Sequence, residues 1–282
     1  MILVFGKNGQ LAKELAVLEG VTCVGREVAD LSNPDACSTL IRALTPAAVI
    51  NAAAYTAVDK AEDEEELATL INGTAPGAMA AVCAELAIPF LHVSTDYVFA
   101  GTGEAAWAPA DPVAPQNAYG RSKLAGEVAV QKAAGAFAIL RTSWVVSAHG
   151  NNFVKTMLRL GNERKKLRIV SDQIGAPTSA RAIAVACLTI VDALIARTNK
   201  SGVYHFQSTP YTSWADFARM IFAEAGLSCE VEDIQSSLYP TPATRPLNSR
   251  LDCTTLKNIF GISRPDWHAD VRDILKDLEV YP

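Results

Sequence analysis

The sequence has few residues that could hold a metal ion or form a disulfide framework. Its 282 residues include six cysteines and four histidines, both scattered along the chain. The closest cysteines, Cys23 and Cys37, are too far apart for a Cys-x-x-Cys pair. This spacing argues against a zinc site and against a redox-active dithiol. We therefore predict no metal site from the residues alone.

The chain also has no excess of basic residues and no long apolar run. It carries 25 Lys and Arg against 30 Asp and Glu, a net charge of -5, whereas a nucleic-acid-binding face is usually basic. The N-terminal apolar run Ile2–Phe5 ends at Gly6, and no stretch approaches the length of a membrane span. We expect a cytoplasmic protein with neither a nucleic-acid nor a membrane partner.

What the sequence does contain is a regular alternation of short apolar runs and longer amphipathic segments. The short runs predict parallel strands that are buried on both faces. The segments between them predict helices, so the order is typical of an α/β fold with a Rossmann-type, doubly wound parallel sheet. The predicted strands are Ile2–Phe5, Val21–Val24, Ala48–Ala53, Phe90–Ser94 and Phe137–Arg141.

This alternation loosens after about Trp144, where turns rich in Gly, Asn and Pro become frequent. We therefore predict a Rossmann domain over residues 1–145, in which the glycine turn after the first strand would allow NAD(P) binding. Residues 146–282 are expected to form mainly a smaller α/β lobe that binds the substrate. The chain should cross between the two more than once, with segments near 180–210 returning to the first domain.

The first predicted strand ends in a glycine-containing turn that leads into a helix. Gly6 would permit the tight turn, and Gly9 would let the backbone approach a pyrophosphate. The small Ala12 would allow close contact between helix and strand, and the helix start would offer unpaired amides to a phosphate. A simple turn without a ligand is the alternative.

Arg26 follows the second predicted strand, where a site that prefers NAD usually has a carboxylate for the ribose. Because an Arg can pair with a 2′-phosphate instead, we expect NADPH to be used at least as well as NADH. Glu27 argues in the other direction, and Arg26 could also be an ordinary surface residue. A short loop could bring Asp30, which precedes Leu31, against the adenine amino group.

Tyr119 and Lys123 form the strongest local signal. Their spacing places both on one face of a helix, where an ammonium would lower the pKa of the phenol. Such a tyrosine can give a proton to a carbonyl oxygen as hydride reaches the carbon. A hydroxyl at the end of an earlier strand, such as that of Thr95, could polarise this carbonyl. An ordinary helix face is the alternative, whereas Ser122 lacks the second glycine of a hydrolase nucleophile elbow.

Longer stretches resemble the dTDP-4-dehydrorhamnose reductases, a family of the extended short-chain dehydrogenase/reductases. The matching stretches follow one another in order from about residue 1 to residue 255. Beyond the glycine turn and the Tyr–Lys pair, they are residues 51–62, 94–99, 141–145, 151–153, 172–178 and 240–251.

This resemblance implies NADPH- or NADH-dependent reduction of the C4 ketone of dTDP-4-dehydro-L-rhamnose to dTDP-L-rhamnose. It implies that Thr95 binds the carbonyl, that Tyr119 donates the proton, and that Lys123 tunes Tyr119 and holds the nicotinamide ribose. Further implied cofactor contacts are Gly6, Gly9, Gln10, Leu11, Arg26, Asp30, Leu31, Ala54, Tyr55, Thr56 and Val93. The implied substrate contacts are Thr95, Asp96, Trp144, Asn152 and Arg245.

The last three residues also have purely structural interpretations. Trp144 could fill a gap between the lobes, Asn152 could cap a helix, and Arg245 could be a surface residue, although a guanidinium suits a diphosphate. Some family members carry magnesium between acidic residues at a dimer interface. Here Arg181 stands where a carboxylate partner of Glu14 is expected, which speaks against that metal and leaves both monomer and homodimer open.

Two other functions fit the same motifs. A related nucleotide-sugar 4-ketoreductase or epimerase/reductase would act on another sugar or carrier. A regulatory subunit of methionine adenosyltransferase, which belongs to the same family, would bind NADP and a partner enzyme without turnover. The intact Thr95, Tyr119 and Lys123 argue against this second alternative.

Overall fold

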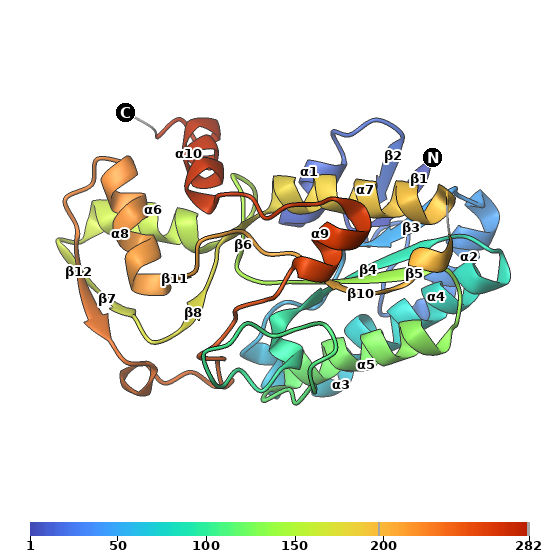
Figure 1. Ribbon diagram of the computed structural model, residues 1–282, viewed down its shortest axis with the longest axis horizontal. Coiled ribbons are helices and arrows are strands. Elements are labelled where there is room, and N and C mark those ends of the chain that lie inside the picture. Colours follow the sequence, from blue (N-terminus) through green and yellow to red (C-terminus); the bar gives the residue numbers. More distant parts are fainter. Residues whose placement is uncertain (197, 281–282) are drawn as a thin grey trace.

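A six-stranded parallel sheet forms the centre of the computed structural model, which describes residues 1–196 and 198–280 (Figure 1). The strand order is β10-β5-β4-β3-β1-β2, and every neighbouring pair is parallel. The predicted doubly wound α/β class is confirmed. The strands are β1 (Ile2–Phe5), β2 (Val21–Val24), β3 (Ala48–Asn51), β4 (Phe90–Thr95), β5 (Phe137–Thr142) and β10 (Gly202–His205).

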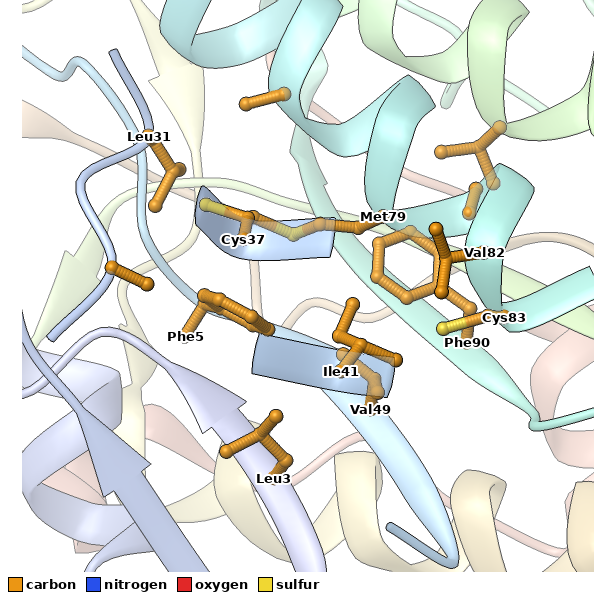
Figure 2. Packing of buried hydrophobic residues seen from close by; sticks show 14 of the residues in the cluster. Leu3, Phe5, Leu31, Cys37, Ile41, Val49, Met79, Val82, Cys83 and Phe90 are labelled. Carbon is orange, nitrogen blue, oxygen red and sulfur yellow. The ribbon is translucent and has the colours of Figure 1, made fainter. Parts of the chain in front are cut away.

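One face of the sheet is covered by α2 (Pro34–Leu44), α4 (Ala75–Glu85) and α5 (Ala118–Lys132) (Figure 1). Leu3 and Phe5 of β1 point to this side, because alternate residues of a strand face opposite ways. Figure 2 shows them packed with side chains from α2 and α4. This layer supports the strands whose carboxyl ends carry the site.

The opposite face is covered by α1 (Gln10–Leu15) and α7 (Ala180–Ala196), which pack against each other. Val4 and Ile50 point to this side and are fully buried there. In the chain, α7 is followed closely by β10, which forms one edge of the six-stranded sheet. Both elements therefore belong to the layered first part of the protein. Burial on both faces explains why these strands read as continuous apolar runs.

One helical run passes the length and composition test for a membrane span, contrary to the expectation from sequence. It covers Glu65–Glu85 and consists of α3 (Glu65–Thr69), a π-helical turn (Leu70–Thr74) and α4. In its most apolar window 56% of the residues are buried inside the protein. Because α4 packs on α2 and α5, burial in the core accounts for its apolar character.

A second lobe follows β5 and has its own apolar core, in which Phe217 and Trp267 are buried. Two helices of this lobe, α6 and α8, pack together beside the parallel pair β7 and β12 (Figure 1). Its elements are β6 (Val145–Val146), α6 (Phe153–Glu163), β7 (Lys166–Val170), β8 (Ile174–Gly175), β9 (Thr178–Ser179), β11 (Thr212–Ser213), α8 (Trp214–Glu224), β12 (Glu230–Ile234) and α10 (Trp267–Asp277). The helix α9 (Thr254–Phe260) lies against α7 and β10 instead.

Candidate active site

The end of β4 places a hydroxyl and a carboxyl side by side. The Thr95 hydroxyl accepts a hydrogen bond from the backbone N–H of Tyr97 at 3.2 Å and donates one to Asp96 at 3.1 Å. Thr95 and Asp96 are both buried. Burial raises the pKa of the Asp96 carboxyl to about 6, although hydrogen bonds from Ser249 and Thr95 act against this rise.

Tyr119 enters this site from the first turn of α5. Asn117 caps the helix by accepting a hydrogen bond from the Gly120 N–H at 2.8 Å. A Cβ at Gly120 would lie 2.3 Å from the Tyr97 carbonyl oxygen, so only glycine lets α5 approach so closely. The rings of Tyr119 and Tyr97 meet edge to face with centroids 5.6 Å apart. The structure thus brings Tyr119 beside the turn that holds Thr95.

Lys123 lies one helical turn further along and is buried. Its Nζ donates to the Val93 carbonyl oxygen at 2.7 Å and lies 3.2 Å from His92 Nε2. Burial lowers the pKa of Lys123 to about 8, against the opposing charge of Glu127. The sequence pointed to Val93 as a neighbour of the nicotinamide, and here its backbone holds the lysine.

The pKa of Tyr119 differs from the sequence expectation. Burial, followed by the nearby charge of Asp96, raises it to about 12, and only a hydrogen bond with Thr95 lowers it. We had expected Lys123 to lower this pKa. The correction has a geometric cause, because the Lys123 amine is hydrogen-bonded to Val93 and lies against His92.

A buried ion pair that the sequence did not reveal fixes the strand ends against α5. Arg141 of β5 and Glu127 of α5 meet at 2.6 Å, and Ser94 donates to the same carboxylate at 2.6 Å. All three side chains are nearly inaccessible to solvent. Neither partner carries a local motif, so only the fold could show that they meet.

A cavity of about 190 Å³ opens beside β1 and β2, on the side of the glycine turn. Six of the cofactor contacts named from sequence line it. These are Gly6, Arg26, Asp30, Leu31, Ala54 and Tyr55, together with Lys7, Asn8, Val24, Gly25, Ala29, Ala53 and Ile71. Gly9, Gln10, Leu11 and Thr56 are outside this lining.

The two glycines of the turn after β1 differ in their backbone conformation and in the space around them. Gly6 adopts φ +121°, a conformation that side chains with a Cβ rarely adopt. A Cβ there would lie 3.3 Å from the Ala53 nitrogen and 3.5 Å from the Ala12 Cβ. Gly9 has no atom near its missing Cβ, so the protein itself does not require a glycine at that position.

The side chains of Arg26 and Glu27, which follow β2, have different partners. Glu27 forms an ion pair with Lys7 at 2.6 Å, and this hydrogen bond lowers the pKa of the carboxyl. Arg26 lines the cavity and lies 3.5 Å from Asp30, which in turn accepts from the Ser32 N–H. The carboxylate that seemed to favour NAD is therefore occupied by a lysine, and the guanidinium is the group at the cavity.

The loop after β3 is held by the buried side chain of Asn72, a role that the sequence did not predict. Asn72, in the π-helical turn, accepts from the Tyr55 N–H at 2.8 Å and donates to the Tyr55 carbonyl at 3.0 Å. It also donates to Ser122 of α5 at 2.9 Å. One buried amide thus ties the loop with Ala54 and Tyr55 to the helix that carries Tyr119.

Trp144 stands where the chain passes from the sheet into the second lobe. It has φ 48° and stacks on Trp214 with ring centroids 3.6 Å apart. A Cβ at Gly175 would lie 2.8 Å from the Trp144 ring. Trp144 therefore does pack between the lobes, and its role toward a substrate stays a prediction.

Arg245 and Asn152 both bind other parts of the protein. Arg245 forms an ion pair with Asp59 at 2.7 Å, while its second terminal nitrogen, Nη1, is buried without a hydrogen-bond partner. Thr244 beside it accepts a hydrogen bond from Asn117 at 2.8 Å. Asn152 caps α6 and contacts Gln10. Of the two, Arg245 retains a free donor that could bind an anion.

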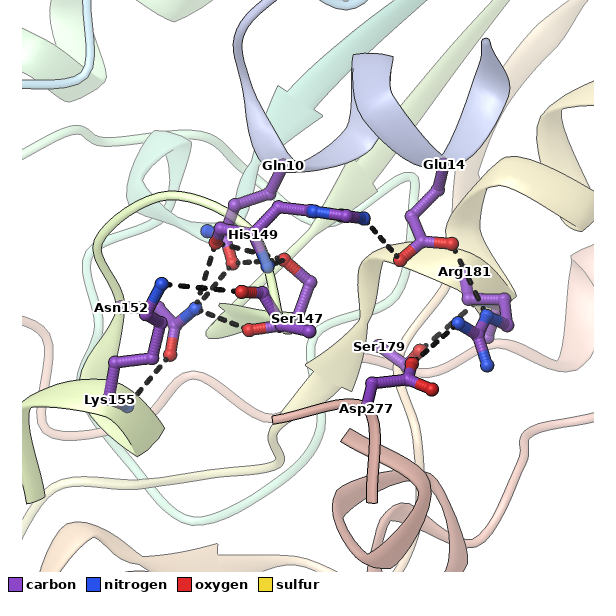
Figure 3. Close-up of polar contacts among 11 residues, drawn as sticks. Gln10, Glu14, Ser147, His149, Asn152, Lys155, Ser179, Arg181 and Asp277 are labelled. Atoms are coloured by element: carbon purple, nitrogen blue, oxygen red, sulfur yellow. Dashed lines mark hydrogen bonds and ion pairs between the residues drawn. The ribbon is translucent and has the colours of Figure 1, made fainter. Parts of the chain in front are cut away.

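The residues around Glu14 do not fit a magnesium ion. Its two carboxylate oxygens lie 3.2 Å from Arg181 and 3.5 Å from His149, and Arg181 also pairs with Asp277 at 2.7 Å (Figure 3). A guanidinium thus occupies the position beside the carboxylate, where a cation would compete with it. Within residues 1–196 and 198–280, no group of three His, Cys, Asp or Glu side chains is placed to hold a metal.

Comparison with known proteins establishes the family. A family model described as the RmlD substrate binding domain matches residues 1–280. The dTDP-4-dehydrorhamnose reductase of Burkholderia thailandensis is 45% identical over 293 residues, covering 98% of each protein. The chain belongs to the dTDP-4-dehydrorhamnose reductase family. The resemblance seen in the sequence motifs is confirmed.

Solved structures of dTDP-4-dehydrorhamnose reductases have the same fold. The protein from Clostridium acetobutylicum has a TM-score of 0.92 and 35% identity, covering 99% of each chain. That from Bacillus anthracis, solved in complex with NADP, has a TM-score of 0.91 and 33% identity, covering 98% of each chain. The predicted class of enzyme, an oxidoreductase, is therefore also confirmed.

Proposed function

We propose that this protein reduces the C4 ketone of dTDP-4-dehydro-L-rhamnose to dTDP-L-rhamnose, using NADPH. The observation that carries the proposal is the placement of three side chains around β4. Tyr119 lies beside the turn that holds Thr95, and Lys123, one helical turn further along α5, reaches the Val93 carbonyl of β4. The relatives named dTDP-4-dehydrorhamnose reductase are similar to this chain over nearly their whole length, which supports the same reaction.

Thr95 and Tyr119 would act on the ketone oxygen. The Thr95 hydroxyl would bind the carbonyl and polarise it, and the Tyr119 phenol would donate the proton that the oxygen needs as the alcohol forms. Its raised pKa of about 12 keeps the phenol protonated at neutral pH, as a donor must be. NADPH, when bound, supplies the hydride that reaches C4.

Lys123 would stabilise the ionised form of Tyr119 and bind the nicotinamide ribose. In this structure its Nζ is already held at 2.7 Å from the Val93 carbonyl, on the helix face that carries Tyr119. To stabilise the phenolate left after proton transfer, the ammonium would have to leave the Val93 carbonyl and approach Tyr119. The charge of Lys123 would then matter most in the second half of the reaction, when Tyr119 must be reprotonated.

The choice of NADPH over NADH is supported by Arg26 at the adenosine cavity and by the pairing of Glu27 with Lys7. A relative from Bacillus anthracis was solved with NADP. We expect Gly9 and the N–H groups of Gln10 and Leu11 to face the pyrophosphate, with Thr56 near the cofactor.

We propose the reducing cytoplasm as the location, since the six cysteines are free thiols.

The dTDP moiety would bind between the sheet and the second lobe. The buried Nη1 of Arg245 lacks a partner, and a diphosphate oxygen would satisfy it. Asp96 and Trp144 remain our proposed contacts for the sugar, at the end of β4 and at the entrance to the second lobe.

A panel of 4-keto sugars on dTDP, UDP and GDP carriers tests the proposal with the purified protein and NADPH. We expect oxidation of NADPH with the dTDP-linked 4-keto sugar, and a loss of about 10²- to 10⁴-fold in rate for Tyr119→Phe. Tyr239→Phe, at an exposed tyrosine, is the matched control. Turnover on another carrier would point to a related ketoreductase. Stable co-purification with methionine adenosyltransferase, without turnover, would point to a regulatory subunit.

A further inference from the structure

One face of α1 lies against the second lobe (Figure 3). Gln10 and Glu14 are one helical turn apart, so their side chains leave the helix on the same side. Gln10 contacts residues that follow β5, and Glu14 contacts His149 and Arg181. The helix that begins at the predicted cofactor turn therefore contacts the second lobe through Gln10 and through the pairing of Glu14 with His149, whereas Arg181 joins it to α7.

Both the nitrogen and the oxygen of the Gln10 side-chain amide form hydrogen bonds with the second lobe. Its Nε2 donates to the Val145 carbonyl at 3.3 Å, and its Oε1 accepts from the Ser147 hydroxyl and from Asn152 Nδ2, each at 2.9 Å. These contacts fix which end of the amide faces which partner. The side chain is thus directed away from the glycine turn, and only the backbone N–H of Gln10 is left to face a phosphate.

Asn152 has an equally complete set of partners. Its Oδ1 accepts from the Lys155 N–H at 3.2 Å and so caps α6. Its Nδ2 donates to Gln10 Oε1, to the Ser147 carbonyl at 2.7 Å and to the His149 carbonyl at 3.2 Å. An amide nitrogen has only two hydrogens. Asn152 therefore has no spare donor for a diphosphate.

We propose that Asn152 is a positioning residue that couples the cofactor site to the substrate site by holding Gln10. Cofactor binding would fix the Gly6–Gln10 turn, and the Gln10 side chain would then hold the second lobe in the orientation that accepts the dTDP-sugar. Because such coupling is reciprocal, the dTDP-sugar would tighten cofactor binding by the same factor. The inference rests on the proposed function, since it takes the cofactor to bind at this turn.

Two single variants and their combination test the coupling. Asn152→Ser keeps the cap of α6, because Ser is a good N-cap residue, but its hydroxyl is too short to replace the amide at Gln10. Gln10→Met removes the other partner while keeping the length and the backbone N–H. Asp266→Ser, at the cap of α10, is the control for a changed cap in the same lobe.

The measurement is the Kd of NADPH with and without saturating dTDP, by calorimetry. For the wild type and for Asp266→Ser we expect dTDP to tighten NADPH binding about tenfold. For Asn152→Ser, Gln10→Met and the double variant this factor should fall to about one, with the double variant no worse than either single one. Thermal melts check that each variant folds.

Three results would overturn the coupling. The first is a wild-type protein whose NADPH affinity does not respond to dTDP. The second is a factor that survives in either Asn152→Ser or Gln10→Met. The third is weaker binding of dTDP alone in Asn152→Ser with unchanged NADPH binding, which would make Asn152 a diphosphate contact. Failure of the wild type to bind NADPH would instead contradict the proposed function itself.

Discussion

At the scale of single residues, burial controls the protonation of the candidate catalytic groups. It raises the pKa of Tyr119 and of Asp96 and lowers that of Lys123, in each case by disfavouring the charged form. Near pH 7 the pKa of about 12 keeps Tyr119 protonated, whereas values of about 6 and 8 leave Asp96 and Lys123 mostly charged but closer to titration than free side chains. Such shifted groups in one place are typical of functional sites.

Asp96 gives a prediction about stability and pH. Its pKa of about 6 in the folded protein exceeds the ordinary value near 4. The folded state thus binds the proton more tightly, and stability is lost as the pH rises from about 4 through 6. Asp96→Asn, neutral at every pH, should raise the free energy of unfolding near pH 8 by on the order of 2 kcal/mol and change it little near pH 4.

Urea unfolding of Asp96→Asn at both pH values measures this effect, with Asp192→Asn at an exposed position of α7 as the control. An equal change in the free energy of unfolding at both pH values would show that folding does not raise the pKa of the Asp96 carboxyl. The same variant should lose activity, because Asp96 is a proposed contact for the sugar.

Arg26 gives a prediction about cofactor choice. If its guanidinium binds the 2′-phosphate, Arg26→Ala should raise the KM for NADPH roughly tenfold and leave that for NADH nearly unchanged. Arg42→Ala is the control, since Arg42 is an exposed arginine paired with Glu85 away from the cavity. An unchanged KM for NADPH would make Arg26 a surface residue only.

At the scale of elements, two glycines of one turn should respond differently to substitution. Gly6 has φ +121° and little room for a Cβ, whereas a Cβ at Gly9 would meet no protein atom. We expect Gly6→Ala to destabilise the fold by about 1 kcal/mol or more. Gly9→Ala should leave the melting temperature unchanged and weaken NADPH binding about tenfold. Melts and NADPH titrations separate the two, and normal NADPH binding by Gly9→Ala would contradict a pyrophosphate at this turn.

Elements were also what the sequence predicted best. The strand at Ile2–Phe5 has the predicted bounds, because a buried parallel strand leaves a continuous apolar run. The strand at Val21–Val24 also has the predicted bounds, although it is an edge strand in which Thr22 is exposed. The pair β7 and β12 was not predicted, since its strands alternate between polar and apolar residues and carry several charges. The π-helical turn around Asn72 has no sequence signal either, because its register depends on the packing of α4 against α5.

The site was predictable only where a residue type has a known chemical role in a motif. Tyr119, Lys123 and Thr95 belong to such a motif and come together at the end of β4. The partners of Gln10 and Arg245 were not predictable, because they lie more than a hundred residues away in the chain and meet only in the folded protein.

At the scale of the whole molecule, ion pairs between side chains join the two lobes. Arg181 pairs with Glu14 and Asp277, and Arg245 pairs with Asp59. We therefore expect neither a chelator nor millimolar magnesium to change the rate of ketone reduction or the sedimentation of the protein. A magnesium-dependent increase in mass or in activity would contradict this arrangement.

Following the transferred hydride tests whether this protein reduces the C4 ketone of the sugar. The wild-type protein is supplied with NADPH that carries deuterium at the transferred position and with dTDP-4-dehydro-L-rhamnose, and the product is examined by NMR spectroscopy. We predict dTDP-L-rhamnose with deuterium at C4 of the sugar, formed at least about 10²-fold more slowly by Tyr119→Phe. Deuterium at another carbon, or no transfer to the sugar, would contradict the account.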